Sequence, residues 1–177
     1  MAKNLVKRSD KKAFWGIPAS GGSGTPTFTR MKGFTELSGS KNPTEYSRQY
    51  VDEIFESTDV TGYSPSWSFA FDDYTEDAVL EDIVEILDNE KTGTDAQREL
   101  VFVDFTRTGT GGGFKAVRQT FSVIGDAEGD STDAYTYSGN LRVVGLKEFG
   151  TATIATPTSG TPDNVQTVTF TAESDAE

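Results

Sequence analysis

Histidine and cysteine are both absent from this sequence of 177 residues. Histidine is the commonest general base and metal ligand near neutral pH, and cysteine is a common nucleophile and zinc ligand. Their absence excludes disulfide bonds, catalytic triads built on either residue, and ordinary zinc or non-haem iron sites. We therefore expect neither an enzyme nor a bound metal or cofactor.

Long apolar segments are missing as well. No run approaches the ~20 apolar residues that cross a bilayer. The basic N-terminal residues 1–12 are not followed by the apolar stretch of a secretory signal. We expect a protein that is made in the cytoplasm and does not associate with a membrane.

Basic residues are scarce and unevenly placed. The chain has 16 basic and 28 acidic side chains, a net charge of −12. Residues 1–50 carry nine basic and three acidic side chains, whereas residues 51–124 carry five and sixteen, and residues 125–177 carry two and nine. A net acidic body argues against sequence-specific nucleic-acid binding, which requires a basic face opposite the phosphates.

Alternation of apolar and small or polar residues predicts several strands. The clearest strand is residues 67–71, where Trp67, Phe69 and Phe71 share one face. Residues 100–105 are apolar on both faces, which is typical of a covered strand. The other predicted strands are residues 28–37, 44–56, 117–123 and 135–143. The sequence thus predicts a mainly β (α+β) fold, a β-sandwich or barrel.

One helix is predicted over residues 75–90, flanking the sheet. Its apolar stripe follows the i, i+4, i+7, i+8 spacing and consists of Val79, Ile83, Ile86 and Leu87. Asp73 or Thr75 can cap its N-terminus, and Gly93 is a plausible stop. The opposite face is acidic, which is typical of a solvated surface.

Composition divides the chain into three segments. Residues 1–27 combine basic residues with a Gly/Ser-rich run, which predicts a flexible basic arm. Residues 28–149 form the β-domain, and residues 150–177 are expected to be a linker followed by a strand. That last strand can pair with its own sheet or with a neighbouring subunit.

Three local patterns suggest chemistry, and each has a better structural explanation. The glycine cluster at residues 109–114 lacks a Gly-Lys-Ser/Thr ending and joins two predicted strands, which indicates a hairpin loop. Asp126, Glu128 and Asp130 are spaced like the start of a calcium loop, but serine stands where that loop needs glycine. The carboxylate pairs within residues 72–77 suit a helix N-terminus better than glycosidase chemistry.

Four stretches of the chain stand in a characteristic order and spacing. They are residues 46–53 (Tyr-Ser-Arg-Gln-Tyr-Val-Asp-Glu), 58–66, 83–94 and 129–139. Together they resemble the major tail tube proteins of bacteriophages with long, non-contractile tails. The resemblance covers roughly residues 28–150 and depends on the set, since none of the stretches is diagnostic alone.

The resemblance implies a β-sandwich-like domain with one helix on its flank, six copies of which close into a ring. The inner sheets then form one continuous barrel, and rings stack along a tape measure protein. Further implied partners are a tail terminator and distal tail or baseplate proteins, and double-stranded DNA passes through the lumen without sequence-specific binding. The implied location is the virion, after assembly in the cytoplasm of the bacterial host.

Two hypotheses about assembly follow. Acidic strand residues line the bore and repel DNA, while the helix lies outside. The basic arm docks on the adjacent ring. Its candidate inter-ring contacts are Lys7, Arg8, Lys11, Lys12, Phe14 and Trp15.

Three other functions stay open from the sequence. The chain could be an adhesion or decorating β-domain on a virion surface, which would remain a monomer or trimer. It could be the inner tube of a contractile tail or tailocin. A carboxylate hydrolase would instead show turnover sensitive to Asp72 or Glu76.

Overall fold

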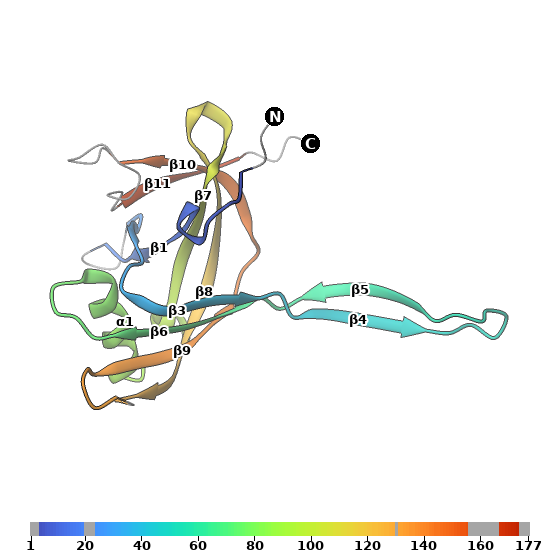
Figure 1. Cartoon of the computed structure of the whole chain (residues 1–177), viewed down its shortest axis with the longest axis horizontal. Helices are drawn as coiled ribbons and strands as arrows, with labels where there is room; N and C mark the ends of the chain where they lie inside the picture. Colours follow the sequence, from blue (N-terminus) through green and yellow to red (C-terminus); the bar gives the residue numbers. More distant parts are fainter. Residues whose placement is uncertain (1–3, 20–23, 130, 156–166, 174–177) are drawn as a thin grey trace.

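The computed structural model describes residues 4–19, 24–129, 131–155 and 167–173, which fold mainly into strands (Figure 1). The strands are β1 (Lys11–Ile17), β2 (Thr27–Arg30), β3 (Phe34–Ser40), β4 (Pro43–Arg48), β5 (Ser57–Tyr63), β6 (Ser66–Asp72), β7 (Gln97–Thr108), β8 (Phe114–Glu128), β9 (Thr136–Val143), β10 (Glu148–Ile154) and β11 (Thr167–Ala172). The helix is α1 (Ala78–Asp88), and short 3-10 turns lie at Arg8–Asp10, Gly93–Ala96 and Thr110–Gly112.

Six strands close into a barrel. Their order is β10-β11-β2-β1-β7-β8, and β8 pairs again with β10 to complete the circle. Closure pairs the strand edges that an open sheet would leave exposed. The mainly β fold with one helix, predicted from the sequence, is confirmed.

The long strand β8 belongs to two structures at once. Its first half pairs with β10 in the barrel, and its second half pairs with β9, from Phe121 opposite Val143 to Glu128 opposite Tyr137. Strands β6 and β3 extend this second sheet to the order β8-β9-β6-β3, with every pair antiparallel. We call these four strands the open sheet.

Strands β4 and β5 pair with each other and with no other strand of the described chain. They leave the body as a long ribbon (Figure 1). The sequence prediction of one strand over residues 44–56 is therefore wrong in its second half, because the chain turns back within residues 49–56.

Helix α1 covers the core side of the open sheet. Val79, Ile83 and Ile86 are fully buried there, Leu87 packs at the margin of the cluster, and Leu80, which lies outside the predicted stripe, is buried with them. The helix begins later than predicted because neither Asp73 nor Thr75 is the cap. The Asp77 carboxylate accepts hydrogen bonds from the backbone N–H groups of residues 79 and 80, at 3.1 and 3.4 Å.

The N-terminal segment is not the flexible arm that its composition predicts. Residues 11–17 form β1, which lies inside the barrel sheet between β2 and β7. Phe14 and Trp15 are both 0% exposed, and they point to opposite sides of the strand into two separate apolar clusters. They are core residues of their own subunit, so their predicted role as contacts between rings is wrong.

The C-terminal prediction is also corrected in part. The expected linker overlaps β10, which pairs with both β8 and β11. The expected last strand corresponds to β11, and it pairs with β10 and β2 of its own chain. The segment between them, residues 156–166, lies outside the described residues.

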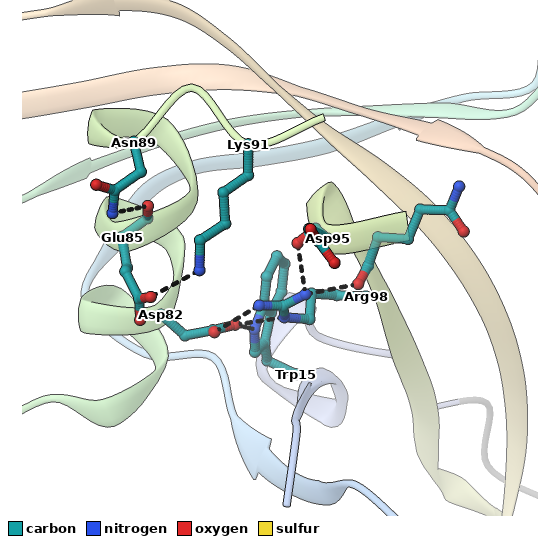
Figure 2. Close-up of polar contacts among 8 residues, drawn as sticks. Trp15, Asp82, Glu85, Asn89, Lys91, Asp95 and Arg98 are labelled. Atoms are coloured by element: carbon teal, nitrogen blue, oxygen red, sulfur yellow. Dashed lines mark hydrogen bonds and ion pairs between the residues drawn. The ribbon is translucent and has the colours of Figure 1, made fainter. Parts of the chain in front are cut away.

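A buried ion pair joins the helix to the barrel (Figure 2). Asp82 on α1 accepts two hydrogen bonds from the Arg98 guanidinium on β7, both at 2.8 Å, and one from the Trp15 indole at 2.7 Å. The two charged side chains are 11% and 9% exposed. The carboxylate thus connects three elements that are far apart in the sequence.

A second carboxylate of α1 makes a hydrogen bond at the far end of the open sheet. Tyr137 on β9 donates its hydroxyl to Asp88 at 3.0 Å. Burial, together with this hydrogen bond, raises the pKa of Tyr137 above its ordinary value. The hydroxyl therefore stays protonated, and continues to donate to the helix, up to a higher pH than an ordinary tyrosine would.

Candidate assembly surfaces

The described part of the chain shows neither a metal-binding cluster nor a membrane-spanning helix. No group of three or more carboxylates is placed to hold a metal ion there, and Asp130 of the calcium-like sequence lies outside the described residues. None of the helices that are described is long and apolar enough to span a membrane. The surfaces that call for an explanation are two unpaired strand edges, a polar sheet face, an exposed ribbon and a basic groove.

The open sheet has two unpaired edges within the described chain. One is the outer edge of β3, since β3 pairs only with β6. The other is the end of β8, because β7 starts opposite Ser122 and leaves residues 124–128 paired with β9 alone. All five of these residues are exposed. Unpaired backbone N–H and C=O groups at such edges are templates for pairing with another chain.

One face of the open sheet is turned away from α1 and is covered with small polar side chains. Ser68 and Asn140 lie opposite each other on it and share a hydrogen bond of 3.2 Å. The same face carries Glu36, Ser38, Ser40, Ser66, Asp72, Ser122, Ile124, Thr136, Ser138 and Arg142, all half-buried or exposed. We call this the hydroxyl face.

The β4–β5 ribbon buries almost nothing against its own subunit. Every residue of β4 is exposed, and so is every residue of β5 except Gly62. An isolated two-stranded hairpin is marginally stable in water. The ribbon therefore depends on a partner for most of its order.

The end of the ribbon combines apolar and acidic side chains. Its large apolar residues are strongly exposed: Val51 at 109%, Ile54 at 86% and Phe55 at 83%. Residues 49–56 also contain three carboxylates and no basic residue. The loop has a defined turn, because the Glu53 N–H donates to the Tyr50 carbonyl at 3.1 Å. We call residues 49–56 the hairpin tip.

A groove of about 630 Å³ lies between the base of the ribbon and the barrel. Trp67, Phe102 and Phe149 provide apolar lining, and the Trp67 and Phe102 rings stack with centroids 4.5 Å apart. The basic residues of the lining are Arg8, Lys11, Lys12, Lys41, Arg107, Lys115 and Lys147. Its acidic residues are Asp104 and Glu173. We call this the basic groove.

The charges of the basic groove are only partly compensated within the subunit. Asp104 pairs with Lys11 at 3.3 Å and with Arg107 at 3.7 Å. Lys41 and Lys147 instead lie near each other. Partial burial and the charge of Lys41 lower the pKa of Lys147. Two adjacent ammonium groups repel each other, so this part of the groove favours an incoming anion.

The basic residues predicted as arm contacts do gather, although not on a flexible arm. Arg8, Lys11 and Lys12 all line the basic groove. The Arg8 guanidinium is held by the carbonyls of Lys11 and Leu37, at 2.8 and 3.2 Å. Lys7 does not belong to the lining, and its backbone N–H donates instead to the Asp10 carboxylate at 2.7 Å.

Sequence reasoning missed the hairpin tip and four cations of the groove. The groove is assembled from β1, β3, β6, β7, β8, β10 and the segments beside them, so local sequence gives no sign of it. The tip could have been predicted. Val51, Ile54 and Phe55 are interspersed with carboxylates, so they share no apolar strand face that would be buried in the subunit's own core, which indicates an exposed apolar contact.

The fold occurs in solved tail tubes. A chain from the tail of an empty gene transfer agent particle, refined with C6 symmetry, superposes with a TM-score of 0.57 and 15% identity over 82% of this chain and 98% of the other. A chain of the native gene transfer agent virion gives 0.56 and 14% over the same shares. The SPP1 tail tube gives 0.52 and 17% over 81% and 78%. Neither a family model nor a curated protein matches this chain. The chain has the tail tube fold, as the sequence resemblance predicts.

Proposed function

We propose that this chain is the subunit of a non-contractile phage tail tube, and that its copies close into hexameric rings that stack into a conduit for DNA. The single observation that carries this proposal is the open sheet of the tail tube fold, whose two edges are unpaired within the described chain. The proposed location is the virion, and the proposed role is structural rather than enzymatic.

The strand directions of the open sheet favour ring closure. Four strands that alternate in direction begin with β3 and end with β8, so these two edge strands run in opposite directions. When copies are related by rotation about a ring axis, β3 of one copy meets β8 of the next as an antiparallel neighbour. Closure then satisfies both edges of every copy. The C6 symmetry of the gene transfer agent tail supports six copies per ring.

The hydroxyl face suits a surface over which DNA slides. Its charged side chains are few: Glu36 on β3, Asp72 on β6 and Arg142 on β9. Each cation that neutralises a phosphate adds affinity through counterion release, so a bore with few cations holds DNA weakly. We propose that this face lines the bore. The lining would then be mainly small and polar, with two carboxylates and one guanidinium per subunit, so the acidic bore of the sequence-based hypothesis is reduced to a small acidic excess.

Added lysines on the hydroxyl face test this assignment. Tubes with Ser68→Lys, Ser138→Lys and Asn140→Lys are expected to assemble and to bind double-stranded DNA in their lumen, with affinity falling steeply as salt rises. The measurement is DNA retention by purified tubes at about 50 and 200 mM salt. The matched control places three lysines at Thr75, Thr92 and Thr94, which are neutral and exposed outside this face, so that the net charge changes by the same amount. Equal DNA binding by both variants would refute the bore assignment.

A tape measure protein, a tail terminator and distal tail proteins are proposed as further partners, on the strength of the sequence resemblance. At each end of a stack of rings, the surfaces through which neighbouring rings contact each other remain exposed. Proteins with complementary surfaces are therefore needed to start and to stop it. A free subunit exposes the same contact surfaces and has to stay in solution until it is added to a ring. Its net charge of −12 favours this.

Electron microscopy of the purified, concentrated protein tests the proposal directly. The expected result is hollow tubes with sixfold symmetry in cross-section. A stable monomer or trimer that forms no tubes at any concentration or salt would favour the adhesion or decorating domain instead. Tubes that bind a contractile sheath protein would favour the inner tube of a contractile tail.

A further inference from the structure

The hairpin tip and the basic groove are complementary in charge and in polarity. The tip has three carboxylates, at Asp52, Glu53 and Glu56, among exposed apolar residues. The groove has basic residues around an apolar floor that includes Trp67 and Phe102. Within the described residues the tip stays exposed, and the groove is only partly compensated, since Lys41 lies beside Lys147 while Asp104 pairs with Lys11 and Arg107.

The tip cannot reach the groove of its own subunit. Ser40 and Lys41 at the base of the ribbon line the groove, and β4 then leads away from it for six residues, or about 20 Å at ~3.3 Å per residue. Paired strands are stiff, and Figure 1 shows the ribbon extended away from the body. A hairpin tip that occupies this groove must therefore belong to a different molecule.

We propose that the hairpin tip of each subunit docks in the basic groove of a second copy of this chain. The inference rests on the proposed tube assembly and identifies the contact that links the copies beyond the sheet edges. Ile54 and Phe55 lie against the apolar floor, and the tip carboxylates approach Lys41, Lys115 and Lys147 at the rim. A groove of about 630 Å³ falls in the range of ~300–1,000 Å³ that encloses a drug-sized group, which is the scale of a few side chains.

The geometry also makes the contact self-propagating. Tip and groove are different surfaces of one subunit, so each copy gives one contact and receives another, head to tail. After each docking step the assembly still presents a free tip on one copy and a free groove on another, so further copies can be added. It also relieves the repulsion between the two lysines, because each docked tip brings carboxylates to them.

Charge exchange between the two surfaces tests the proposal. One variant reverses the tip with Asp52→Lys, Glu53→Lys and Glu56→Lys. The other reverses the groove with Lys41→Glu, Lys115→Glu and Lys147→Glu. Each alone is expected to raise the protein concentration needed for tube formation at least ~10-fold, because like charges then meet at every contact.

An equimolar mixture of the two variants is expected to assemble again, within about threefold of the wild-type concentration. In the mixture every basic tip finds an acidic groove and every acidic tip finds a basic one. The matched control is Asp73→Lys, Glu90→Lys and Asp95→Lys, which makes the same charge change on exposed residues elsewhere and should not be rescued by the groove variant.

Disulfide trapping gives a second readout that does not require tubes. The protein contains no cysteine, so single substitutions report without background. A mixture of Ile54→Cys and Lys147→Cys subunits should form a cross-linked heterodimer on mild oxidation, whereas Glu90→Cys in place of Ile54→Cys should not.

The outcomes separate this inference from the proposed function. Wild-type protein that never forms tubes overturns the function. Tubes from both reversed variants at the wild-type concentration, or cross-linking equal to the Glu90→Cys control, overturn the docking while leaving the tube intact. Rescue by mixing together with selective cross-linking supports it.

Discussion

Replacing Asp82 by alanine is expected to destabilise the folded subunit by about 3–5 kcal/mol, since it leaves the buried Arg98 guanidinium without its counter-ion. The Arg98 side chain is only 9% exposed, and both of its bonds to Asp82 are 2.8 Å long. The Trp15 indole N–H loses its acceptor in the same step. For a chain of this length the loss corresponds to a fall of roughly 6–20 °C in the midpoint of thermal unfolding.

A matched control lies one turn along the same helix, as Figure 2 shows. Glu85 pairs with Lys91 at 2.6 Å, but its side chain is 61% exposed. Glu85→Ala is expected to cost less than about 1 kcal/mol, because exposed ion pairs are screened and well solvated when broken.

The double variant Asp82→Ala with Arg98→Ala isolates the pair itself. It should cost clearly less than the sum of the two single changes, since neither charge is then left buried alone. Urea unfolding followed by circular dichroism measures the free energy of unfolding of the wild-type protein, the two single variants, the double variant and Glu85→Ala. A loss below 1 kcal/mol for Asp82→Ala would show that Arg98 finds water or another partner, and that the ion pair does not hold α1 on the barrel.

The fold class, the helix and the half-buried strands could be predicted from the sequence. Strand β6 (Ser66–Asp72) matches the predicted residues 67–71, because Phe69 and Phe71 face the helix while Ser68 and Ala70 face away. A strand with one covered face leaves period-two alternation in its sequence. The helix leaves its own period, and the order of such segments limits the number of folds.

Strand β1 could not be predicted for the same physical reason. It lies between two cores, with Trp15 in the cluster under α1 and Phe14 in the barrel cluster. A strand buried on both faces shows no alternation, and the Gly/Ser-rich residues that follow it dominate the local composition. Its burial is decided by β2 and β7, which pair with it from distant positions in the chain.

The ribbon was predicted poorly for the opposite reason. Both faces of β4 and β5 are exposed, so neither strand has to alternate. Residues 49–56 contain no glycine, proline or asparagine, which are the usual signs of a turn. The basic groove could not be predicted from the sequence, since its walls come from segments that only the folded barrel brings together.

Removal of the ribbon is expected to abolish tube formation and leave the subunit folded. The variant joins Thr44 to Gly62, which are paired residues, through an Asn-Gly turn. Because the deleted residues bury almost no surface on their own subunit, the free energy of unfolding should change by less than about 1 kcal/mol. Urea unfolding and sedimentation velocity measure stability and assembly on the same sample.

The assembly defect should be large because the hairpin tip gathers three large apolar side chains that are strongly exposed on the free subunit. Burial of Val51, Ile54 and Phe55 in a neighbour contributes about 1.5–3 kcal/mol for each side chain, and this is an upper limit. Even half of the smaller sum raises the required concentration about 40-fold. The full-length variant with serine at these three positions keeps the length and charge of the ribbon and should show most of the same defect.

Hydrogen exchange connects both effects to a single cause. In the free subunit the backbone amides of the ribbon should exchange rapidly, because two strands without a core open easily, while the amides of β7 and β8 stay protected. In assembled tubes the ribbon amides should become protected as well, since the neighbour supplies the missing apolar surface. A ribbon that is equally protected in both states would mean that it is stable by itself, and a deletion that unfolds the subunit would mean that the barrel depends on it. Either result would contradict the view that this segment serves the neighbouring copy rather than its own chain.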